Sequence, residues 1–224
     1  MSLQTLILCG GKGERLRPLT DDLPKPLVEI NDKAILGYII DHLLKFDIDN
    51  IIIASGYKSE IINKYIDSEY PALNIKISNQ GNVDIIERIT SVTPEVASDL
   101  IVMYGDTISD VDLKELIEFS NNRVESVAVT LWPLRSQFGV LELDENNKVV
   151  SYTEKPILNK WINIGYFYFK QKGLSMLEGC NSFEEYLSKL VSKQELAGYK
   201  HKGQHITVNS LKDLKEAESQ LLKI

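Results

Sequence analysis

The residues best able to do chemistry lie in one segment, 10–27, directly after a short apolar run. Glycines occupy three of its first four positions, which are Gly10, Gly11 and Gly13. Because glycine leaves backbone N–H groups uncovered, such a turn suits a close approach to phosphate oxygens. Arg15 and Lys25 follow in the same segment, and three prolines restrict the backbone that carries them. The pattern predicts a turn that binds phosphate with two cations held in fixed places.

Two common phosphate motifs do not fit this segment. A P-loop requires a lysine followed by serine or threonine, whereas Lys12 is followed by Gly13. A dinucleotide fingerprint requires a third glycine at the position that Leu16 occupies. An ordinary strand-to-helix turn with surface charges is the simpler alternative, and the Pro-Lys-Pro triplet around Lys25 argues against it.

A carboxylate follows a second apolar run, residues 100–104. Asp106 lies there directly after Gly105. Magnesium prefers one or two carboxylates together with phosphate oxygens and water, so Asp106 suits a magnesium site. The alternative is that Asp106 caps a turn or the next helix, but Asp110 and Asp112 are better placed as caps.

A third cluster lies in the second half of the chain. A hydroxylated ligand that carries a phosphate needs hydrogen-bond acceptors and a cation, which Glu154 and Lys155 supply as neighbours. Gly139 would let the backbone approach such a ligand, and Asn163 could reach a hydroxyl. The alternative for the Glu-Lys pair is a solvated strand end, which is a very common arrangement.

Apolar runs and helical patterns alternate along the first 131 residues. Continuous apolar runs predict buried strands, and apolar residues three or four apart predict amphipathic helices. Strands are expected at 6–9, 51–54, 75–77, 100–104 and 127–131, and helices at 35–44, 61–66, 84–89 and 113–117. This order predicts an α/β fold with a doubly wound, mostly parallel sheet, whose ligands bind beyond the carboxyl ends of the strands.

The second half is less regular. The runs at 140–143, 149–153 and 164–169 alternate or are apolar, and Asn146-Asn147 predicts a hairpin turn between the first two. We therefore expect a mixed or antiparallel extension that carries the pocket for the hydroxylated ligand, and a closing helix at 211–222. No linker or repeat divides the 224 residues, which predicts a single domain.

The composition argues against several classes of partner. A formal charge of −7 argues against a nucleic-acid partner, which needs a basic face. No apolar run approaches the roughly twenty residues of a membrane span, so we expect a soluble, cytoplasmic protein with no membrane partner. Cys9 and Cys180 show no metal-ligand spacing, and Cys9 ends a strand expected to be buried.

Segment 10–27 resembles the signature of the sugar-1-phosphate nucleotidylyltransferases, Gly-Gly-x-Gly-x-Arg-Leu-x-Pro-Leu-Thr-x-x-x-Pro-Lys-Pro-Leu, at every fixed position. Residues 105–112 resemble the metal segment of glucose-1-phosphate cytidylyltransferases, and residues 182–186 resemble heptose-1-phosphate guanylyltransferases. The resemblance implies a Rossmann-like fold of the GT-A type, with a nucleotide-binding half at about 1–131 and a sugar-phosphate-binding half at about 132–224.

The resemblance also implies an activity. A nucleoside triphosphate (NTP) and a sugar 1-phosphate would react with Mg²⁺ as cofactor to give a nucleotide sugar and pyrophosphate. Within the family such products serve bacterial surface polysaccharides. Many dTTP- or UTP-dependent relatives carry a Leu-Gly-Thr-Ala-Gly pattern, which this chain lacks after residue 79. We therefore favour CTP or GTP over dTTP or UTP as the nucleotide substrate. Two alternatives stay open: an enzyme for a non-sugar phosphate, and a non-catalytic sensor of nucleotide or sugar phosphate.

The resemblance assigns roles to individual residues. Arg15 would hold the departing phosphates, Lys25 would stabilise charge at the α-phosphate, and Mg²⁺ would lie on Asp106 and Asn209. Further nucleotide contacts are expected from Cys9, Gly10, Gly11, Gly13, Gln80 and Gly105, and substrate contacts from Gly139, Glu154, Lys155 and Asn163.

Asn209 departs from the family pattern. Most relatives carry aspartate at this position, and an amide adds no charge to a metal site. Asn209 is therefore the only support for the sensor alternative, and it could instead cap the final helix. No catalytic role is expected of a histidine, with His201 and His205 expected at the surface. A homodimer is left open.

Overall fold

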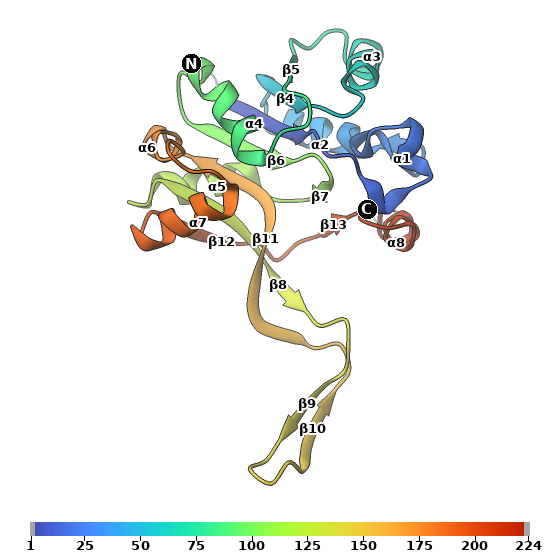
Figure 1. Ribbon diagram of the computed structural model, residues 1–224, viewed down its shortest axis with the longest axis vertical. Coiled ribbons are helices and arrows are strands. Elements are labelled where there is room, and N and C mark those ends of the chain that lie inside the picture. The colour runs from blue at the N-terminus through green and yellow to red at the C-terminus, as the bar shows by residue number, and fades with distance from the viewer. Residues whose placement is uncertain (1–2, 222–224) are drawn as a thin grey trace.

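A computed structural model describes residues 3–221, and a seven-stranded sheet forms its centre (Figure 1). The strands lie in the order β12-β8-β11-β6-β1-β4-β5. Their bounds are β1 Gln4–Cys9, β4 Ile51–Ser55, β5 Lys76–Asn79, β6 Leu100–Tyr104, β8 Val127–Arg135, β11 Ile157–Phe169 and β12 Leu196–Lys200. Within this sheet β11 runs antiparallel to both neighbours, and every other pair is parallel. The expected α/β fold with a mostly parallel sheet is confirmed.

Successive residues of the central strands pack on opposite faces of the sheet. Leu6 and Ile52 belong to one core cluster, whereas Ile7 and Ile53 belong to the other. The face of Ile7 is covered by α2 Ile35–Leu44, α3 Ser59–Glu69, α5 Leu113–Asn121 and α8 Leu211–Leu221. The opposite face is covered by α4 Ile85–Val92, α6 Gln171–Ser175 and α7 Phe183–Ser192. Because both faces are covered, the strands consist of continuous apolar runs.

The elements expected from apolar patterns are present, with their ends shifted by a few residues. The sequence analysis did not identify α6, α7, β12 or several short pieces. The short pieces carry too few apolar residues to show a period, whereas Phe183, Tyr186 and Leu190 of α7 do recur at helical spacing. The short pieces are η1 Glu14–Leu16, α1 Leu19–Asp22, η2 Lys25–Leu27, β2 Glu29–Ile30, β3 Lys33–Ala34, η3 Thr93–Glu95, β7 Thr107–Ser109 and β13 His205–Thr207. Residue 222 of the expected closing helix lies outside the described residues. None of the helices within residues 3–221 has the length and apolarity needed to cross a membrane.

The aspartates after β6 have different roles. Asp112 caps α5 as expected, since its carboxylate accepts from the backbone N–H of Glu115 at 3.0 Å. Asp110 does not cap a helix: its Oδ1 lies 3.0 Å from Nε2 of His201 and accepts from the backbone N–H of Gln204. The expectation that both would be caps is therefore wrong for Asp110. Asp106, the third aspartate, is free of any capping role and faces the glycine turn.

An arm projects from the body of the protein (Figure 1). The arm, residues 132–162, consists of the outer parts of β8 and β11 together with a separate two-stranded antiparallel sheet, β9 Val140–Leu143 and β10 Val149–Thr153. Asn147, with φ +64°, forms the expected hairpin turn, and Asp144 closes it by accepting from two backbone N–H groups. The antiparallel extension is thus present, but its tip stands clear of the body that holds the glycine turn.

A bulge marks the point where β11 enters the arm. The pairing with β8 shifts between Asn163 and Phe167, and Gly165 between them has φ +81°. A Cβ on Gly165 would lie 2.4 Å from the ring of Tyr104. A bulge bends the strand that contains it, so this glycine combines a left-handed backbone with a close ring contact.

Gly165→Ala should destabilise the protein more than Gly179→Ala does. Both glycines have left-handed φ, at +81° and +77°, but only at Gly165 would the new methyl group meet another atom within 4 Å. The matched pair separates backbone strain, about 1 kcal/mol, from overpacking, about 1–3 kcal/mol more. Chemical denaturation measures both free energies of unfolding, and equal losses would contradict the role given to the Tyr104 contact.

Candidate active site

The glycine turn connects β1 to η1. Gly13 has φ +64°, a conformation that glycine adopts at little cost, and its carbonyl accepts from Oγ1 of Thr20 at 2.9 Å. A Cβ at Gly13 would lie 2.9 Å from the Cβ of Lys25, so the turn and η2 pack closely. The left-handed residue turns the chain sharply into η1, and this turn places Arg15 above the carboxyl end of the sheet.

Four polar side chains from three separate segments meet beside this turn. Lys25 Nζ lies 2.5 Å from Oδ2 of Asp106 and 3.0 Å from Oδ1 of Asn209. Arg15 Nη2 donates to the same Asn209 oxygen at 2.8 Å. Lys25 is buried, with 9% of its surface exposed, and a buried ammonium requires such partners. The two cations and the two oxygen-bearing residues expected to act together thus lie within hydrogen-bond distance.

Two adjoining cavities open at this cluster. The larger, of about 550 Å³, is lined by Gly11, Lys12, Gly13, Glu14, Arg15, Leu16, Lys25, Asn82, Asp106 and Asn209. The smaller, of about 250 Å³, is lined by Leu8, Cys9, Gly10, Gly11, Lys25, Pro26, Ile85, Arg88, Tyr104, Gly105 and Asp106. Gly11, Lys25 and Asp106 line both, so the paired lysine and aspartate form the wall between them. Asn82, which the sequence pattern did not single out, belongs to the lining.

Asn209 points its side chain at the two cations. The first turn of α8 is instead closed by Ser210, whose Oγ accepts from the backbone N–H of Asp213 at 3.2 Å. Asp213 in turn accepts from the backbone N–H of Asn209 at 3.0 Å, which completes a reciprocal capping arrangement. The cap that was an alternative role for Asn209 is therefore supplied by its neighbour, and the Asn209 amide is available to the site.

Arg88 is a central residue that the sequence analysis missed. It is 4% exposed, and its guanidinium donates to the carbonyls of Ser55 at 2.5 Å, Gly81 at 2.7 Å and Gly10 at 3.4 Å. A Cβ at Gly10 would lie 1.9 Å from the guanidinium carbon, so only glycine fits there. Burial lowers the pKa of Arg88, and the three carbonyls satisfy the buried cation. The residue lies on the buried face of α4, where the helical pattern alone gives no signal.

The remaining nucleotide-side residues lie near the same edge. Gln80 follows β5, and its Nε2 donates to Oγ of Ser78 at 2.9 Å, which leaves its carbonyl oxygen unused by that contact. Burial strongly raises the pKa of the Cys9 thiol, so Cys9 stays protonated and is a packing residue rather than a nucleophile.

His201 is buried against Asp110, and the expectation of a surface position is wrong for it. Burial lowers the pKa of His205 to about 4, so this imidazole is neutral near pH 7.

The expected substrate residues separate into two places. Asn163 lies at the root of the arm, where its Nδ2 is 3.5 Å from Oη of Tyr104, a residue that lines the smaller cavity. Gly139, Glu154 and Lys155 lie in the arm itself, beside β9 and β10, which Figure 1 places at the far end from the glycine turn. The structure of one chain therefore does not bring these three residues to the nucleotide side.

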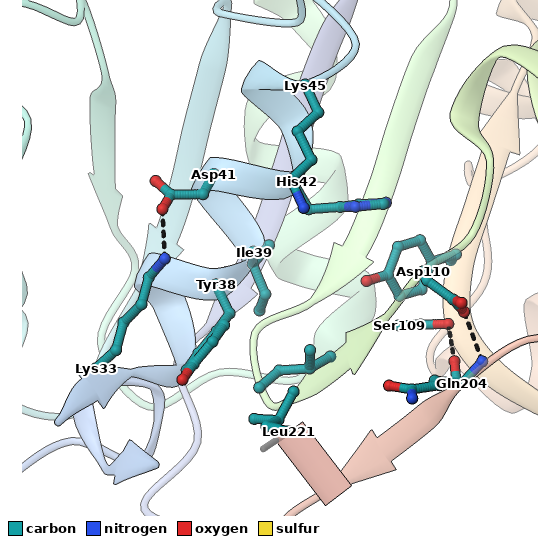
Figure 2. Close-up of a pocket in the computed structure, with 12 residues that line it drawn as sticks. Lys33, Tyr38, Ile39, Asp41, His42, Lys45, Ser109, Asp110, Gln204 and Leu221 are labelled. Carbon is teal, nitrogen blue, oxygen red and sulfur yellow. Dashed lines mark hydrogen bonds and ion pairs between the residues drawn. The ribbon is translucent and has the colours of Figure 1, made fainter. Parts of the chain in front are cut away.

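A separate cavity of about 350 Å³ lies between α2 and β7 (Figure 2). Its carboxylates are already engaged, since Asp41 pairs with Lys33 and Asp110 accepts from the Gln204 N–H. Burial lowers the pKa of His42, and this ring lies 2.9 Å from the carbonyl of Val111. This cavity contains none of the residues that the sequence assigned to chemistry, and His42 has a structural role there.

Residues 4–222 match the family described as nucleotidyl transferase. The chain belongs to the nucleotidyl transferase family. The match spans nearly the whole chain and includes the glycine turn, Asp106 and Asn209. The expected recognition as a sugar-phosphate nucleotidyltransferase, and hence as a transferase enzyme, is confirmed.

Curated relatives match along most of the chain. The bifunctional protein GlmU of Methanocaldococcus jannaschii is 32% identical over 98% of this chain, which spans 54% of that protein's length. The D-glycero-alpha-D-manno-heptose 1-phosphate guanylyltransferase of Campylobacter jejuni is 31% identical over 85% of this chain and 87% of its own length. A probable glucose-1-phosphate cytidylyltransferase of Bacillus subtilis is 30% identical over 96% of this chain and 94% of its own.

A solved structure shares the fold. A putative glucose-1-phosphate thymidylyltransferase from Bacillus anthracis, solved in complex with a sucrose, superposes with a TM-score of 0.79. The alignment covers 100% of this chain and 96% of that chain at 19% identity. At this identity the likeness establishes the fold alone.

The site suits a magnesium ion that is bound by only one or two protein ligands, as is usual in nucleotide enzymes. Within residues 3–221 no group of three or more His, Cys, Asp and Glu side chains could hold a metal. Mg²⁺ in such enzymes takes one or two protein oxygens and completes its shell with phosphate and water. Asp106 Oδ2 and Asn209 Oδ1 already share one cation, the Lys25 ammonium, so their oxygens converge on one point.

Arg88→Lys should lower the free energy of unfolding by about 3 kcal/mol, because one ammonium cannot satisfy three buried carbonyls that a planar guanidinium reaches together. Arg123→Lys is the matched control, since Arg123 forms an exposed pair with Glu125 and its replacement should cost less than about 1 kcal/mol. Urea denaturation of both variants measures the difference, and a loss at Arg88 no larger than at Arg123 would contradict the bridging role.

Proposed function

We propose that this chain transfers a nucleoside monophosphate from an NTP to a sugar 1-phosphate and releases pyrophosphate. The observation that carries the proposal is the Lys25 ammonium held between Asp106 and Asn209 beside the glycine turn. Such a buried cation at the carboxyl end of a parallel sheet suits the binding of anionic phosphates. The relatives at 30–32% identity include a guanylyltransferase and a probable cytidylyltransferase, both named for sugar 1-phosphates.

The acceptor phosphate supplies the nucleophile in this reaction. Its oxygen attacks the α-phosphorus in line, the bond from that phosphorus to the bridging oxygen breaks, and pyrophosphate leaves. No protein nucleophile is needed, in keeping with the raised pKa of the Cys9 thiol. Catalysis then consists of positioning and charge neutralisation.

Each cation has a distinct place in this scheme. Arg15, exposed at the rim of the larger cavity, binds the departing β- and γ-phosphates. Lys25, in the wall between the two cavities, stabilises the charge that develops at the α-phosphate. Gly10, Gly11 and Gly13 offer backbone N–H groups to the nucleotide, and Lys155 orients the acceptor phosphate while Glu154 and Asn163 bind sugar hydroxyls.

Asp106 and Asn209 would hold Mg²⁺ when the nucleotide is bound. A bound Mg²⁺ supplies charge neutralisation for the triphosphate. Asp106 contributes the formal charge of this pair, and the Asn209 amide contributes an oxygen that also accepts from Arg15. Lys25, which contacts both of these oxygens, would bind the phosphates beside the metal.

We infer that the nucleotide is CTP or GTP and that the product is a precursor of surface polysaccharides. The heptose guanylyltransferase and the probable glucose cytidylyltransferase among the relatives support these two bases. Incubation with four triphosphates against several sugar 1-phosphates, with pyrophosphate release as readout, tests both substrates. Release with a sugar 1-phosphate but not with a polyol or amine phosphate supports the proposal, and release with none supports the sensor alternative.

Lys25→Ala should lower kcat by more than about a hundredfold, because the variant loses a buried cation at the site of charge development. Lys64→Ala, on the exposed face of α3, is the control and should keep wild-type turnover. Steady-state kinetics with the best substrate pair measures both, alongside thermal melting to confirm that each variant is folded. Turnover within threefold of wild type for folded Lys25→Ala would remove Lys25 from the chemistry.

Asn209→Asp should raise the affinity for Mg²⁺ by roughly tenfold, because a second carboxylate adds ligand charge at the point where two oxygens converge. Asn82→Asp adds the same charge to the rim of the same cavity and is the matched control. Calorimetric titration with Mg²⁺ in the presence of a non-hydrolysable nucleotide reads affinity without requiring turnover. Equal gains in Mg²⁺ affinity in both variants would show that the added charge acts only through the electrostatic potential of the cavity and that Asn209 is not a ligand.

A further inference from the structure

The middle of segment 10–27 lies at the surface of the protein. Between Arg15 and Lys25 the chain forms α1, a single helical turn, and residues 17–22 are exposed apart from Thr20. One helical turn is not stable alone in water, because its nucleation costs more than its few hydrogen bonds return. A contact with the body must therefore hold α1 and, with it, the spacing of the two cations.

Tyr57 makes such a contact from the corner between β4 and α3. Its hydroxyl donates to the carbonyl of Thr20 at 3.0 Å and lies 3.2 Å from the carbonyl of Asp21. Both carbonyls belong to the last turn of a helix, where no intrahelical N–H reaches them. The neighbouring Lys58 lies 3.8 Å from Oδ1 of Asp22, but Asp22 is fully exposed and such a pair contributes little. The Tyr57 hydroxyl is thus the main polar attachment of α1 to this corner.

Thr20 connects α1 to the glycine turn. Its buried side chain donates through Oγ1 to the carbonyl of Gly13 at 2.9 Å, and the backbone N–H of Leu16 donates to the same carbonyl at 2.9 Å. Arg15 lies in the chain between Gly13 and Leu16, and Gly13 packs closely against Lys25. A displacement of α1 would therefore move the turn and both of its cations.

The corner that carries Tyr57 is itself closely packed. A Cβ at Gly56 would lie 2.3 Å from the carbonyl oxygen of Gly81 and 2.8 Å from Nη2 of Arg88. Lys58 has φ +52°, an uncommon conformation for lysine, and its ammonium lies 5.5 Å from the centroid of the Tyr57 ring. The Tyr57 hydroxyl therefore reaches α1 from a part of the chain that has little freedom to move.

We propose that Tyr57 is a positioning residue for phosphate binding, whose hydroxyl holds α1 in place and so fixes Arg15 and Lys25 for the pyrophosphate part of the ligand. The inference rests on the proposed function for the identity of that ligand, an NTP or the pyrophosphate that leaves. Tyr57 does not line the larger cavity, so it acts through α1 rather than on the ligand.

Loss of the hydroxyl would let α1 leave its place for part of the time. Phosphates bind the form in which α1 is held, so the apparent dissociation constant rises as the held fraction falls. The enzyme with bound NTP has α1 in place in either case, which leaves kcat at saturation unchanged. In the proposed function the sugar phosphate is bound by other residues, and its KM stays unchanged as well. A purely structural role of Tyr57 would not produce this selective effect.

Tyr57→Phe removes the hydroxyl and keeps the ring. Its affinity for inorganic pyrophosphate with Mg²⁺ should fall about fivefold, the size of one net hydrogen bond. Its KM for the NTP should rise by the same factor, with kcat and the KM for the sugar 1-phosphate unchanged.

Tyr38→Phe is the matched control, since the Tyr38 hydroxyl donates to the carbonyl of Ile30 at 2.9 Å and its loss should leave these constants at their wild-type values. Calorimetry and steady-state kinetics measure the constants, and thermal melting confirms that both variants are folded. Equal affinity losses in the two variants, or a lower kcat with unchanged affinity in folded Tyr57→Phe, would overturn the role.

Hydrogen exchange tests the attachment without ligand or activity. The backbone N–H groups of Leu16 and Asp21 donate to carbonyls within segment 10–27, and both should exchange at least about fivefold faster in Tyr57→Phe. The N–H groups of β1, in the centre of the sheet, should keep their rates. Unchanged rates at Leu16 and Asp21 would overturn the inference. If the wild type releases no pyrophosphate with any substrate pair, the proposed function fails, and these exchange rates alone decide whether Tyr57 holds α1.

Discussion

The Lys25 ammonium lies between one carboxylate and one amide oxygen, and this buried contact organises the surroundings of the site. Its partners, Asp106 and Asn209, come from segments 81 and 184 positions away in the chain. Removing the cation would leave Asp106 without its ion-pair partner, and removing either oxygen would leave the cation poorly satisfied. The contact therefore couples the glycine turn, the end of β6 and the start of α8 into one unit.

A second cation, the Arg88 guanidinium, holds together the strand ends beneath the glycine turn. Arg88 reaches three carbonyls at the ends of β1, β4 and β5, and its guanidinium occupies the space that a Cβ at Gly10 or Gly56 would need. Glycine is thus required at both positions by the arginine that packs against them. Because interiors are close-packed, this arrangement fixes the backbone around the glycine turn.

The chemistry divides between body and arm. The body holds the cations and oxygens suited to phosphates, whereas the arm holds Glu154 and Lys155, suited to a phosphorylated sugar. The two parts are joined at the bulge around Gly165, where Tyr104 and Asn163 meet at the edge of the smaller cavity.

The sequence by itself determined the α/β class, the central strands and the glycine turn after the first of them. Continuous apolar runs, helical spacing and a dense glycine signature are local patterns, and local patterns need no knowledge of contacts. Only the tertiary structure decided that Ser210 rather than Asn209 caps α8, that Arg88 supports the glycine turn from 78 positions away, and that His201 is buried. The tertiary structure also decided the direction of the arm. The bend at the bulge depends on packing against Tyr104, and this contact cannot be predicted from the spacing of residues along the chain.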